Sequence, residues 1–393
     1  MPLGLYISVP FCRTKCTYCN FASDVFSKTV FERYTDRLCA DISHAGASAE
    51  QMGGTLDRTV DSIYLGGGTP TLLDVKQLER LFVTVSQNFD LLAGAEVTVE
   101  CAPGTLTPAL IETFAGCGVN RVSLGVQSFV DKEAASVGRL HNRAVVLDEI
   151  ARLRAAGLRN INIDLIAGLP HQSKESWTYS LEQTIDCQAP HVSVYMLEID
   201  EDSRLGHELI AGGTRYHAHS VPDEDLTADL YLMAGERLEA AAVHQYEISN
   251  FARKASESRH NLKYWTRQPY LGFGVDAHSM LPSQDGEAVR FSTADSLEAY
   301  LSGMSLQRTV VDRRSTLEEA FFLGLRLVRG IDLSQIVAEF GEVSVHEYFA
   351  TLTDLVNLGL LERAGELVRL TARGRLLSNE VFERFVSSVP AVQ

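Results

Sequence analysis

Three cysteines stand close together near the start of the chain: Cys12, Cys16 and Cys19. Thiolates at this spacing can wrap one loop around an iron–sulfur cubane and bind three of its irons. The fourth iron is then left without a protein ligand, so it can bind an exchangeable molecule through an amino and a carboxylate group. The spacing therefore predicts a [4Fe–4S] cluster with one open iron.

Other kinds of cysteine site fit this pattern less well. Structural zinc usually takes four protein ligands from paired Cys-x-x-Cys modules, and the sequence has no second module. A redox pair would leave Cys12 without a role. Disulfide frameworks are typical of short secreted chains, whereas this chain has 393 residues and an odd number of cysteines. We expect the other four to be buried small hydrophobic residues: Cys39, Cys101, Cys117 and Cys187.

Composition limits the partners of the chain. Its formal net charge is −16 and 45% of its residues are hydrophobic, so we expect a large core and no nucleic acid partner. The apolar run at the N-terminus follows no basic stretch and ends at Pro10, which is unlike a signal peptide. No stretch approaches the roughly 20 apolar residues of a membrane helix. We therefore expect a reduced, cytoplasmic protein.

Short apolar runs alternate with helix-period segments over the first 200 residues. The six expected strands are Leu3–Val9, Val60–Leu65, Glu96–Glu100, Arg121–Leu124, Asn160–Ile166 and His191–Leu197. The expected helices between them include Lys28–Ile42, Val75–Gln87, Pro108–Ala115 and Ala144–Ala156. Strands and helices in alternation predict an α/β fold with a parallel sheet, here a partial (βα)6-type barrel.

Residues that can bind a ligand follow these strands. The segment Cys12–Cys19 follows the first strand and Gly66–Pro70 follows the second; Glu100 ends the third, Gln127 follows the fourth and Asp164 lies in the fifth. Because the carboxyl ends of parallel barrel strands face one cavity, we expect these residues to form a single site.

The pattern changes in the second half of the chain. We expect a loop at Gly206–Asp225 and a helix at about Leu226–Val243. Further on we expect short amphipathic helices, a hairpin and a last helix, namely Thr316–Leu327, Leu333–Phe340, Val345–Leu358, Leu360–Leu370 and Thr371–Phe385. These elements predict a small, winged-helix-like C-terminal domain. We predict a core barrel at 1–230, an extension of the barrel at 231–310 and the C-terminal domain at 311–393.

The segment from Tyr6 to Phe21, with its three cysteines, resembles the opening of radical S-adenosylmethionine (SAM) enzymes. Within that superfamily the chain is similar, over nearly its whole length, to the oxygen-independent coproporphyrinogen III oxidase group. The resemblance implies that SAM binds the open iron. The residues it assigns to the SAM pocket are Tyr6, Tyr18, Gly67, Gly68, Thr69, Glu100, Gln127, Arg139 and Asp164.

Physical roles can be given to several of these residues. Glycines let backbone groups approach the methionine end of SAM closely, and the Glu100 carboxylate can accept hydrogen bonds from both ribose hydroxyls. Tyr18 could pack against adenine. Plainer roles remain open, because Glu100 could end a strand at the surface, Tyr6 could be a core aromatic, and Arg139 and Asp164 could form an ion pair in the barrel mouth.

The group has an oxidase branch and a heme-chaperone branch, and three features favour the second. Oxidases carry a further cysteine where this chain has Phe21, and they have a longer arm before the cluster loop. The segment His260–Trp265 matches the HNxxYW motif of the chaperones. Imidazole is a common ligand of heme iron, so the resemblance makes His260 a candidate heme ligand and His278 a weaker one. Alternatively, the motif anchors a loop.

The resemblance therefore implies a heme chaperone that binds heme and passes it to an acceptor hemoprotein, with the cluster and SAM supporting the transfer. Contact with a membrane is expected only transiently, through the acceptor. Two alternatives stay open. One is a catalytic radical SAM enzyme of porphyrin metabolism, such as the oxygen-independent coproporphyrinogen III oxidase, and we do not expect that activity. The other is an enzyme acting on RNA, against which the acidic composition counts.

Overall fold

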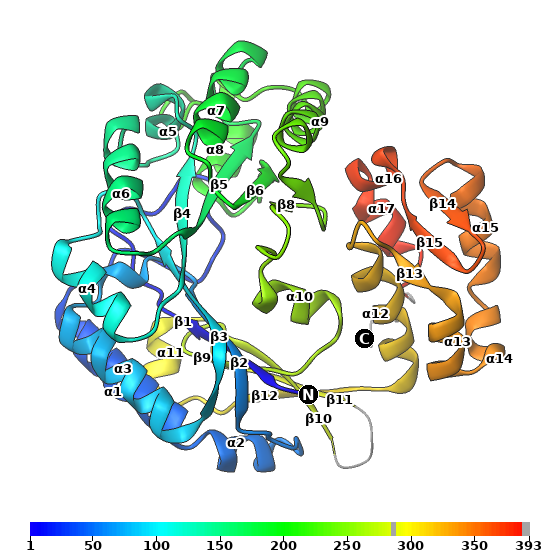
Figure 1. Cartoon of the computed structure of the whole chain (residues 1–393), viewed down its shortest axis with the longest axis horizontal. Helices are drawn as coiled ribbons and strands as arrows, with labels where there is room; N and C mark the ends of the chain where they lie inside the picture. Colours follow the sequence, from blue (N-terminus) through cyan, green and yellow to red (C-terminus); the bar gives the residue numbers. More distant parts are fainter. Residues whose placement is uncertain (284–287, 387–393) are drawn as a thin grey trace.

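The computed structural model describes residues 1–283 and 288–386, and Figure 1 shows their arrangement. A parallel sheet forms the centre of the larger part of the molecule. Its strands lie side by side in chain order: β1 (Leu3–Ser8), β2 (Thr59–Gly66), β3 (Asp90–Cys101), β4 (Arg121–Gln127), β5 (Asn160–Ala167) and β6 (His191–Met196). The predicted α/β class and parallel sheet are confirmed.

Further strands extend this sheet at both edges, which the sequence did not predict. Next to β1 lie β9 (Tyr270–Phe273), β10 (His278–Pro282), β11 (Ala288–Ser292) and β12 (Gln307–Val311). Next to β6 lie β8 (Asn250–Ala252) and β7 (His244–Gln245). The strand β9 is parallel to β1, whereas β10, β11 and β12 are antiparallel to their neighbours. In the described part of the chain the sheet has twelve strands.

Helices cover the outer face of the sheet (Figure 1). They are α1 (Thr29–Ser43), α2 (Ala45–Gln51), α3 (Val75–Asn88), α4 (Pro108–Gly116), α5 (Asp131–Ser136), α6 (Arg143–Ala155) and α7 (Lys174–Asp186). A short 3-10 helix, η1 (Pro70–Leu72), lies between β2 and α3. Local signals fix several helix starts, since the side chains of Asp74 and Thr107 accept hydrogen bonds from Gln77 N and Leu110 N. Strands such as β4 are buried almost throughout, as expected for a sheet covered on both faces.

After β6 the chain adds α8 (Arg204–Ala211), η2 (Ala218–Ser220), α9 (Glu224–Ala240), α10 (Arg259–Trp265) and α11 (Leu297–Ser302). The predicted loop at 206–225 is wrong, because it contains most of α8 and all of η2. Ser203 caps α8 through Gly206 N, and the Glu208 carboxylate accepts backbone N–H groups of Tyr216 and Ala218. These bonds order a segment whose composition indicated a loop.

A smaller unit follows the barrel and lies beside it in Figure 1. It contains α12 (Arg313–Leu325), β13 (Ile331–Asp332), α13 (Leu333–Phe340), α14 (Glu342–His346), α15 (Phe349–Asn357), β14 (Leu361–Ala364), β15 (Leu367–Leu370), α16 (Ala372–Leu376) and α17 (Ser378–Glu383). The three strands form a separate sheet, and most of the unit's buried side chains form a second hydrophobic cluster. The predicted helices at 345–358 and 371–385 are each split into two, at Glu347–Tyr348 and at Leu377.

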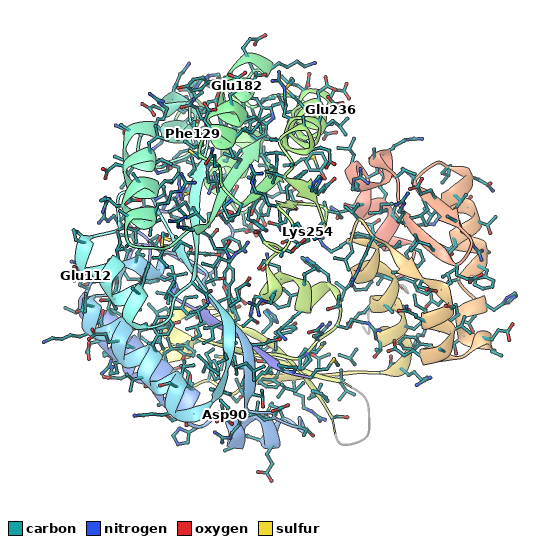
Figure 2. All side chains as sticks on the ribbon, in the orientation of Figure 1. Asp90, Glu112, Phe129, Glu182, Glu236 and Lys254 are labelled. Atoms are coloured by element: carbon teal, nitrogen blue, oxygen red, sulfur yellow. The ribbon has the colours of Figure 1, made fainter. Side chains whose placement is uncertain are left out.

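The predicted boundaries at 230 and 310 stay predictions. Residues 284–287 of the second predicted domain and 387–393 of the third lie outside the described residues. Within the described chain, no helix has the length and hydrophobicity needed to cross a membrane. Figure 2 places the exposed residues Glu112, Glu182 and Glu236 on the outer helices, where acidic groups stay in contact with water.

Candidate iron–sulfur and S-adenosylmethionine site

The loop that carries the three cysteines leaves the end of β1. Val9 N donates a hydrogen bond to Gly66 O at 2.8 Å, and the ring of Phe11 is fully buried against Phe31, with ring centroids 3.8 Å apart. Cys12 N donates to Asp24 O at 2.9 Å and so closes the loop. All seven cysteines carry free thiols, and those of the loop are half-buried.

Each thiol of the loop has a polar neighbour. The hydroxyl of Thr69 is 4.0 Å from Cys12 Sγ and that of Ser23 is 3.9 Å from Cys19 Sγ. Arg139 Nη1 is 3.5 Å from Cys16 Sγ. Burial raises the pKa of the Cys12 and Cys19 thiols, so a positively charged metal centre would favour the thiolates that burial alone disfavours.

No three His, Cys, Asp or Glu side chains of the described residues converge on one metal-ion position. A cubane does not need such convergence, because each of its irons takes one thiolate. The three cysteines on one closed loop therefore fit a [4Fe–4S] cluster better than a single zinc ion.

Contacts from two other elements hold the loop in place. Thr14 Oγ1 donates to Gly138 O at 2.9 Å, and Thr17 N donates to Val137 O at 3.2 Å, just after α5. Leu205 N, at the start of α8, donates to Thr17 O at 2.8 Å. The helix α8 that the sequence reasoning missed therefore covers the cysteine loop. The sequence signal that could have found it is Ser203, which caps Gly206 N.

The glycines after β2 lie where no larger residue fits. Gly67 has a φ of +90°, and a Cβ there would lie 2.7 Å from Ser8 Oγ and 3.2 Å from Tyr6 Oη. A Cβ on Gly68 would lie 2.6 Å from Val9 O. Thr69 N donates to Phe11 O at 2.7 Å, which ties this turn to the cysteine loop. The predicted residues Tyr6, Gly67, Gly68 and Thr69 are thus brought together at the mouth of the barrel.

Glu100 lies in the barrel interior and not at the surface. Tyr64 Oη donates a hydrogen bond to Glu100 Oε1 at 2.7 Å. Burial raises the pKa of Glu100 to about 7; the Tyr64 hydroxyl and the backbone N–H of Gly67 lower it, and the charge of Asp164 raises it further. Further donors, such as two sugar hydroxyls, would favour the ionised carboxylate that burial disfavours.

Gln127 ends β4 with an unusual backbone, since its φ is +68°. This turn directs the side chain inward, and Gln127 Oε1 is a buried acceptor with no partner among the described residues. Leaving a buried polar atom unpaired costs about 1–3 kcal/mol. The residue therefore offers a hydrogen-bond acceptor to a ligand in the barrel mouth.

Arg139 and Asp164 belong to the same mouth. Arg139 Nη2 donates to Gly125 O, while Nη1 faces Cys16. Asp164 accepts hydrogen bonds from Ser123 Oγ at 2.9 Å and from Asn162 Nδ2 at 2.6 Å. Burial raises the pKa of Asp164, whereas these bonds and the charge of Arg139 lower it. In the described structure the Arg139 guanidinium donates to Gly125 O and to Cys16 Sγ, and it acts on Asp164 through its charge.

Tyr18 packs against an apolar cluster formed by Val137, Ile166 and Leu169. Burial and the neighbouring Cys16 raise the pKa of its phenol. The ring thus lies beside the cysteine loop, and its contact with adenine stays a prediction.

His260 lies in the interior and not on an exposed loop. Only 1% of the residue is exposed, Nδ1 is 3.1 Å from Ser62 Oγ and Nε2 is 2.8 Å from Tyr264 Oη. Burial and the nearby Lys263 lower the pKa of its imidazole to about 3, so the ring is neutral. An iron atom could bind a ring nitrogen of His260 only by replacing one of these two hydrogen bonds. Heme ligation by His260 stays a prediction, as does the weaker candidate His278, which is exposed beside Asp276.

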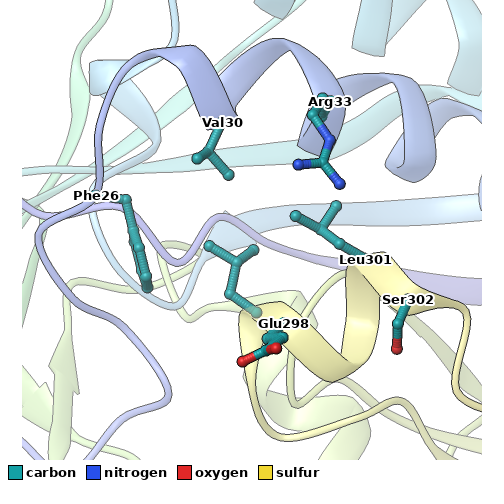
Figure 3. A pocket seen from close by; sticks show the side chains of 7 residues that line it. Phe26, Val30, Arg33, Glu298, Leu301 and Ser302 are labelled. Carbon is teal, nitrogen blue, oxygen red and sulfur yellow. The ribbon is translucent and has the colours of Figure 1, made fainter.

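A separate pocket of about 440 Å³ lies between α1 and α11 (Figure 3). Figure 3 shows Val30 and Arg33 reaching down from α1 toward Leu301 of α11. The ring of Phe26 lines this pocket and also contacts Phe11, with ring centroids 6.0 Å apart. None of the predicted site residues lines it, so the pocket is distinct from the site at the barrel mouth.

The fold and the mouth of the barrel define a radical SAM protein. Residues 6–183 match the family model of the radical SAM superfamily, and residues 311–377 match that of the HemN C-terminal domain. Among solved structures, the coproporphyrinogen III oxidase HemN of Escherichia coli superposes with a TM-score of 0.83 at 23% identity, covering 99% of this chain and 91% of that one. At this identity the likeness establishes the fold alone.

Full-length relatives give the particular family. The heme chaperone HemW of Lactococcus lactis is 32% identical over 98% of this chain and 97% of its own length. HemW of Bacillus subtilis is 32% identical over 98% and 99%, and HemW of Escherichia coli is 30% identical over 98% of each. The chain belongs to the heme chaperone HemW family.

Proposed function

We propose that this protein is a heme chaperone that binds heme and transfers it to an acceptor hemoprotein. The observation that carries the proposal is the match, over almost the whole length of both chains, to proteins named heme chaperone HemW. The HNxxYW segment supports it, because α10 places an imidazole and two large aromatic rings on one short helix.

The proposed cofactors are a [4Fe–4S] cluster on Cys12, Cys16 and Cys19, and SAM on the open iron. When bound, the cluster would supply one-electron chemistry at the SAM sulfonium. The chain's own residues would hold the nucleoside: Gly67 and Gly68 admit the methionine end, Glu100 accepts ribose hydroxyls, and Gln127 offers its unpaired oxygen. Tyr6, Tyr18, Thr69, Arg139 and Asp164 would complete the pocket.

The proposed ligand of heme iron is His260, which would bind the iron through Nε2, the ring nitrogen that now bonds the Tyr264 hydroxyl. Tyr264 is the residue that would move, because its hydroxyl bonds Nε2 while Ser62 holds Nδ1. A ligating histidine commonly donates its other ring N–H to a protein acceptor. We further propose a cytoplasmic location, with membrane contact only through the acceptor.

A heme titration tests this function. Ferric heme added to the reconstituted protein should give a saturable Soret shift at one heme per chain. His260→Ala should weaken heme retention at least about tenfold, whereas His44→Ala, at the end of α1 and exposed, should not. Absence of saturable binding would refute the chaperone function, and an unchanged affinity in His260→Ala would move the heme site elsewhere.

The alternative activity is checked in the same preparation. Position 21, where the oxidase branch carries its extra cysteine, holds a phenylalanine that is 66% exposed, so no fourth thiol extends the cysteine loop. We expect no protoporphyrinogen from coproporphyrinogen III, SAM and dithionite under anaerobic conditions. Formation of that product would favour the oxidase.

A further inference from the structure

One tyrosine connects the proposed SAM site to the proposed heme ligand. Tyr64 Oη donates to Glu100 Oε1 at 2.7 Å. The ring of the same residue stacks on the imidazole of His260, with centroids 5.4 Å apart and an interplanar angle of 28°. Sequence reasoning missed Tyr64, because it stands in an apolar strand and belongs to no motif.

The strand β2 sets this geometry. Residues two apart on a strand point to the same face, so Ser62 and Tyr64 both face the barrel interior. Ser62 Oγ is bonded to His260 Nδ1 at 3.1 Å while the Tyr64 ring covers one side of the imidazole. Together they fix the position and tilt of the ring, and they leave Nε2, now facing Tyr264 Oη, as the nitrogen that could reach a metal.

Neighbouring rings give this arrangement little freedom. Tyr6, which pairs with Tyr64 across β1 and β2, stacks on it at 6.2 Å and lies 6.5 Å from His260. A Cβ on Gly4 would lie 3.1 Å from Ser62 Oγ and 3.3 Å from His260 Cε1. A shift of the Tyr64 ring would therefore also shift the imidazole of His260.

Ligand binding at Glu100 would act on Tyr64 through its hydroxyl. A carboxylate that accepts hydrogen bonds from sugar hydroxyls is held in its ionised form. Hydrogen bonds to an ionised acceptor are roughly twice as strong as neutral ones. The Tyr64–Glu100 bond is thus stronger when the nucleoside is bound, and the tyrosine ring is held more firmly beside His260.

We propose that Tyr64 is a positioning residue that couples the two ligands: SAM at Glu100 orders Tyr64, and Tyr64 orders His260 for heme iron. The inference rests on the proposed function, since it requires heme at His260 and SAM at Glu100. Thermodynamic linkage makes the effect reciprocal, so heme should raise the affinity for SAM by the same factor.

The test is a ferric heme titration of the reconstituted protein with and without saturating SAM, in the absence of reductant. Wild-type protein should bind heme at least about fivefold more tightly with SAM, within the range of typical allosteric couplings. Tyr64→Phe keeps the ring and removes the hydroxyl, so its affinity should be nearly independent of SAM. Tyr300→Phe is the matched control, because it removes another tyrosine–carboxylate bond of the barrel, 2.6 Å long, to Asp41; it should keep the wild-type ratio.

A second variant separates coupling from a general loss of order. Ser62→Ala removes the bond to Nδ1 but leaves Tyr64 and Glu100 in contact, so it should weaken heme binding equally with and without SAM and keep the ratio. A ratio of one in the wild type, or the same ratio in wild type and Tyr64→Phe, would overturn the coupling while heme binding itself stands. If the wild type binds no heme, both the coupling and the proposed function fail.

Discussion

The guanidinium of Arg139 lies against the thiol of Cys16, with Nη1 3.5 Å from Sγ. The absence of a side chain at Gly125 makes this possible, because a Cβ there would lie 2.5 Å from Arg139 Nη2. Burial lowers the pKa of Arg139, but the neighbouring Cys16 and Tyr18 raise it more. A fixed positive charge therefore lies beside one of the three sulfur atoms that we assign to the cluster.

We predict that this charge tunes the cluster. Arg139→Gln removes a cation beside a centre that gains one negative charge on reduction, so its reduction potential should fall. A unit charge about 8 Å away at an effective dielectric of about 20 corresponds to on the order of 50–100 mV for one electron. A redox titration followed by EPR measures the shift.

Arg139→Lys is the charge-conserving control. Its reduction potential should differ from the wild-type value by less than about a third of the shift expected for Arg139→Gln. Arg152→Gln, on α6 and paired with Asp148, removes an arginine elsewhere and should leave the potential unchanged. Equal potentials in wild type and Arg139→Gln would show that the guanidinium does not act on the cluster.

The cysteine assignment predicts a strict division among the seven thiols. Replacement of Cys12, Cys16 or Cys19 by alanine should reduce iron and sulfide from about four of each per chain to well below one, because two thiolates hold a cubane poorly. Cys117→Ala, on the C-terminal side of α4, should keep the full content. Iron, sulfide and EPR measurements on anaerobically reconstituted protein decide between these outcomes, and a bound zinc ion would refute the cluster.

The raised pKa of Glu100 predicts a dependence of stability on pH. The folded pKa, about 7, lies above the ordinary value of 4.5, so the folded state binds this proton more tightly than the unfolded state. The contribution of Glu100 to stability is complete below about pH 4.5 and is lost as the pH rises to about 7. The difference corresponds to at most about 3 kcal/mol.

Glu100→Gln should consequently raise the thermal midpoint of ligand-free protein by about 3–4 °C more at pH 8 than at pH 5. The same variant should weaken SAM binding by about 10- to 100-fold at pH 8, since a charged acceptor is lost. Glu112→Gln, exposed on α4, should show no difference between the two pH values. A shift of the midpoint that is the same at pH 5 and pH 8 would contradict the assigned pKa.

Local patterns predicted much of the fold, because they depend on neighbouring residues. The parallel strands from β1 to β6 follow from apolar runs, and α3 and α4 follow from segments with helical periodicity. The residues of the barrel mouth could also be predicted, since Gly67, Glu100, Gln127 and Asp164 each stand at or near a strand end.

What could not be predicted depends on contacts between distant segments. The helix α8 lies in a segment rich in glycine and histidine. Besides its cap at Ser203, it is held by the backbone bond from Leu205 N to Thr17 O, far away in the chain. The strands β9–β12 are short, and they are fixed by pairing with one another and, through β9, with β1. The setting of His260 depends on Ser62 and Tyr64, almost 200 residues earlier, and no pattern around the HNxxYW segment indicates it.

The last prediction concerns the contact between the barrel and the C-terminal unit. The Glu247 side chain is fully buried, and its charged partner is Arg326, at 3.4 Å, after α12. The guanidinium of Arg326 also lies 4.1 Å above the ring of Trp265, the final residue of the HNxxYW segment. Val328 N donates to Tyr246 O at 3.0 Å beside them. This cluster ties the C-terminal unit to the helix that carries His260.

Arg326→Met keeps apolar contact with Trp265 but leaves the Glu247 carboxyl without its charged partner. Breaking a buried pair in this way typically costs about 3–5 kcal/mol, so the variant should unfold at lower denaturant concentration. Adding Glu247→Gln should recover part of the loss, because no unpaired charge then remains. Lys174→Met, which breaks an exposed pair with Asp229, should cost less than about 1 kcal/mol.

Tryptophan fluorescence can follow this unfolding at both places, since the chain has two tryptophans. Trp177 is buried in the barrel, whereas Trp265 reports on the contact with Arg326. In Arg326→Met the Trp265 signal should change at lower denaturant than the Trp177 signal, because the C-terminal unit is released before the barrel unfolds. A wild-type midpoint in Arg326→Met would mean that Glu247 is neutral in the folded protein and that the aromatic and backbone contacts alone hold the two parts together.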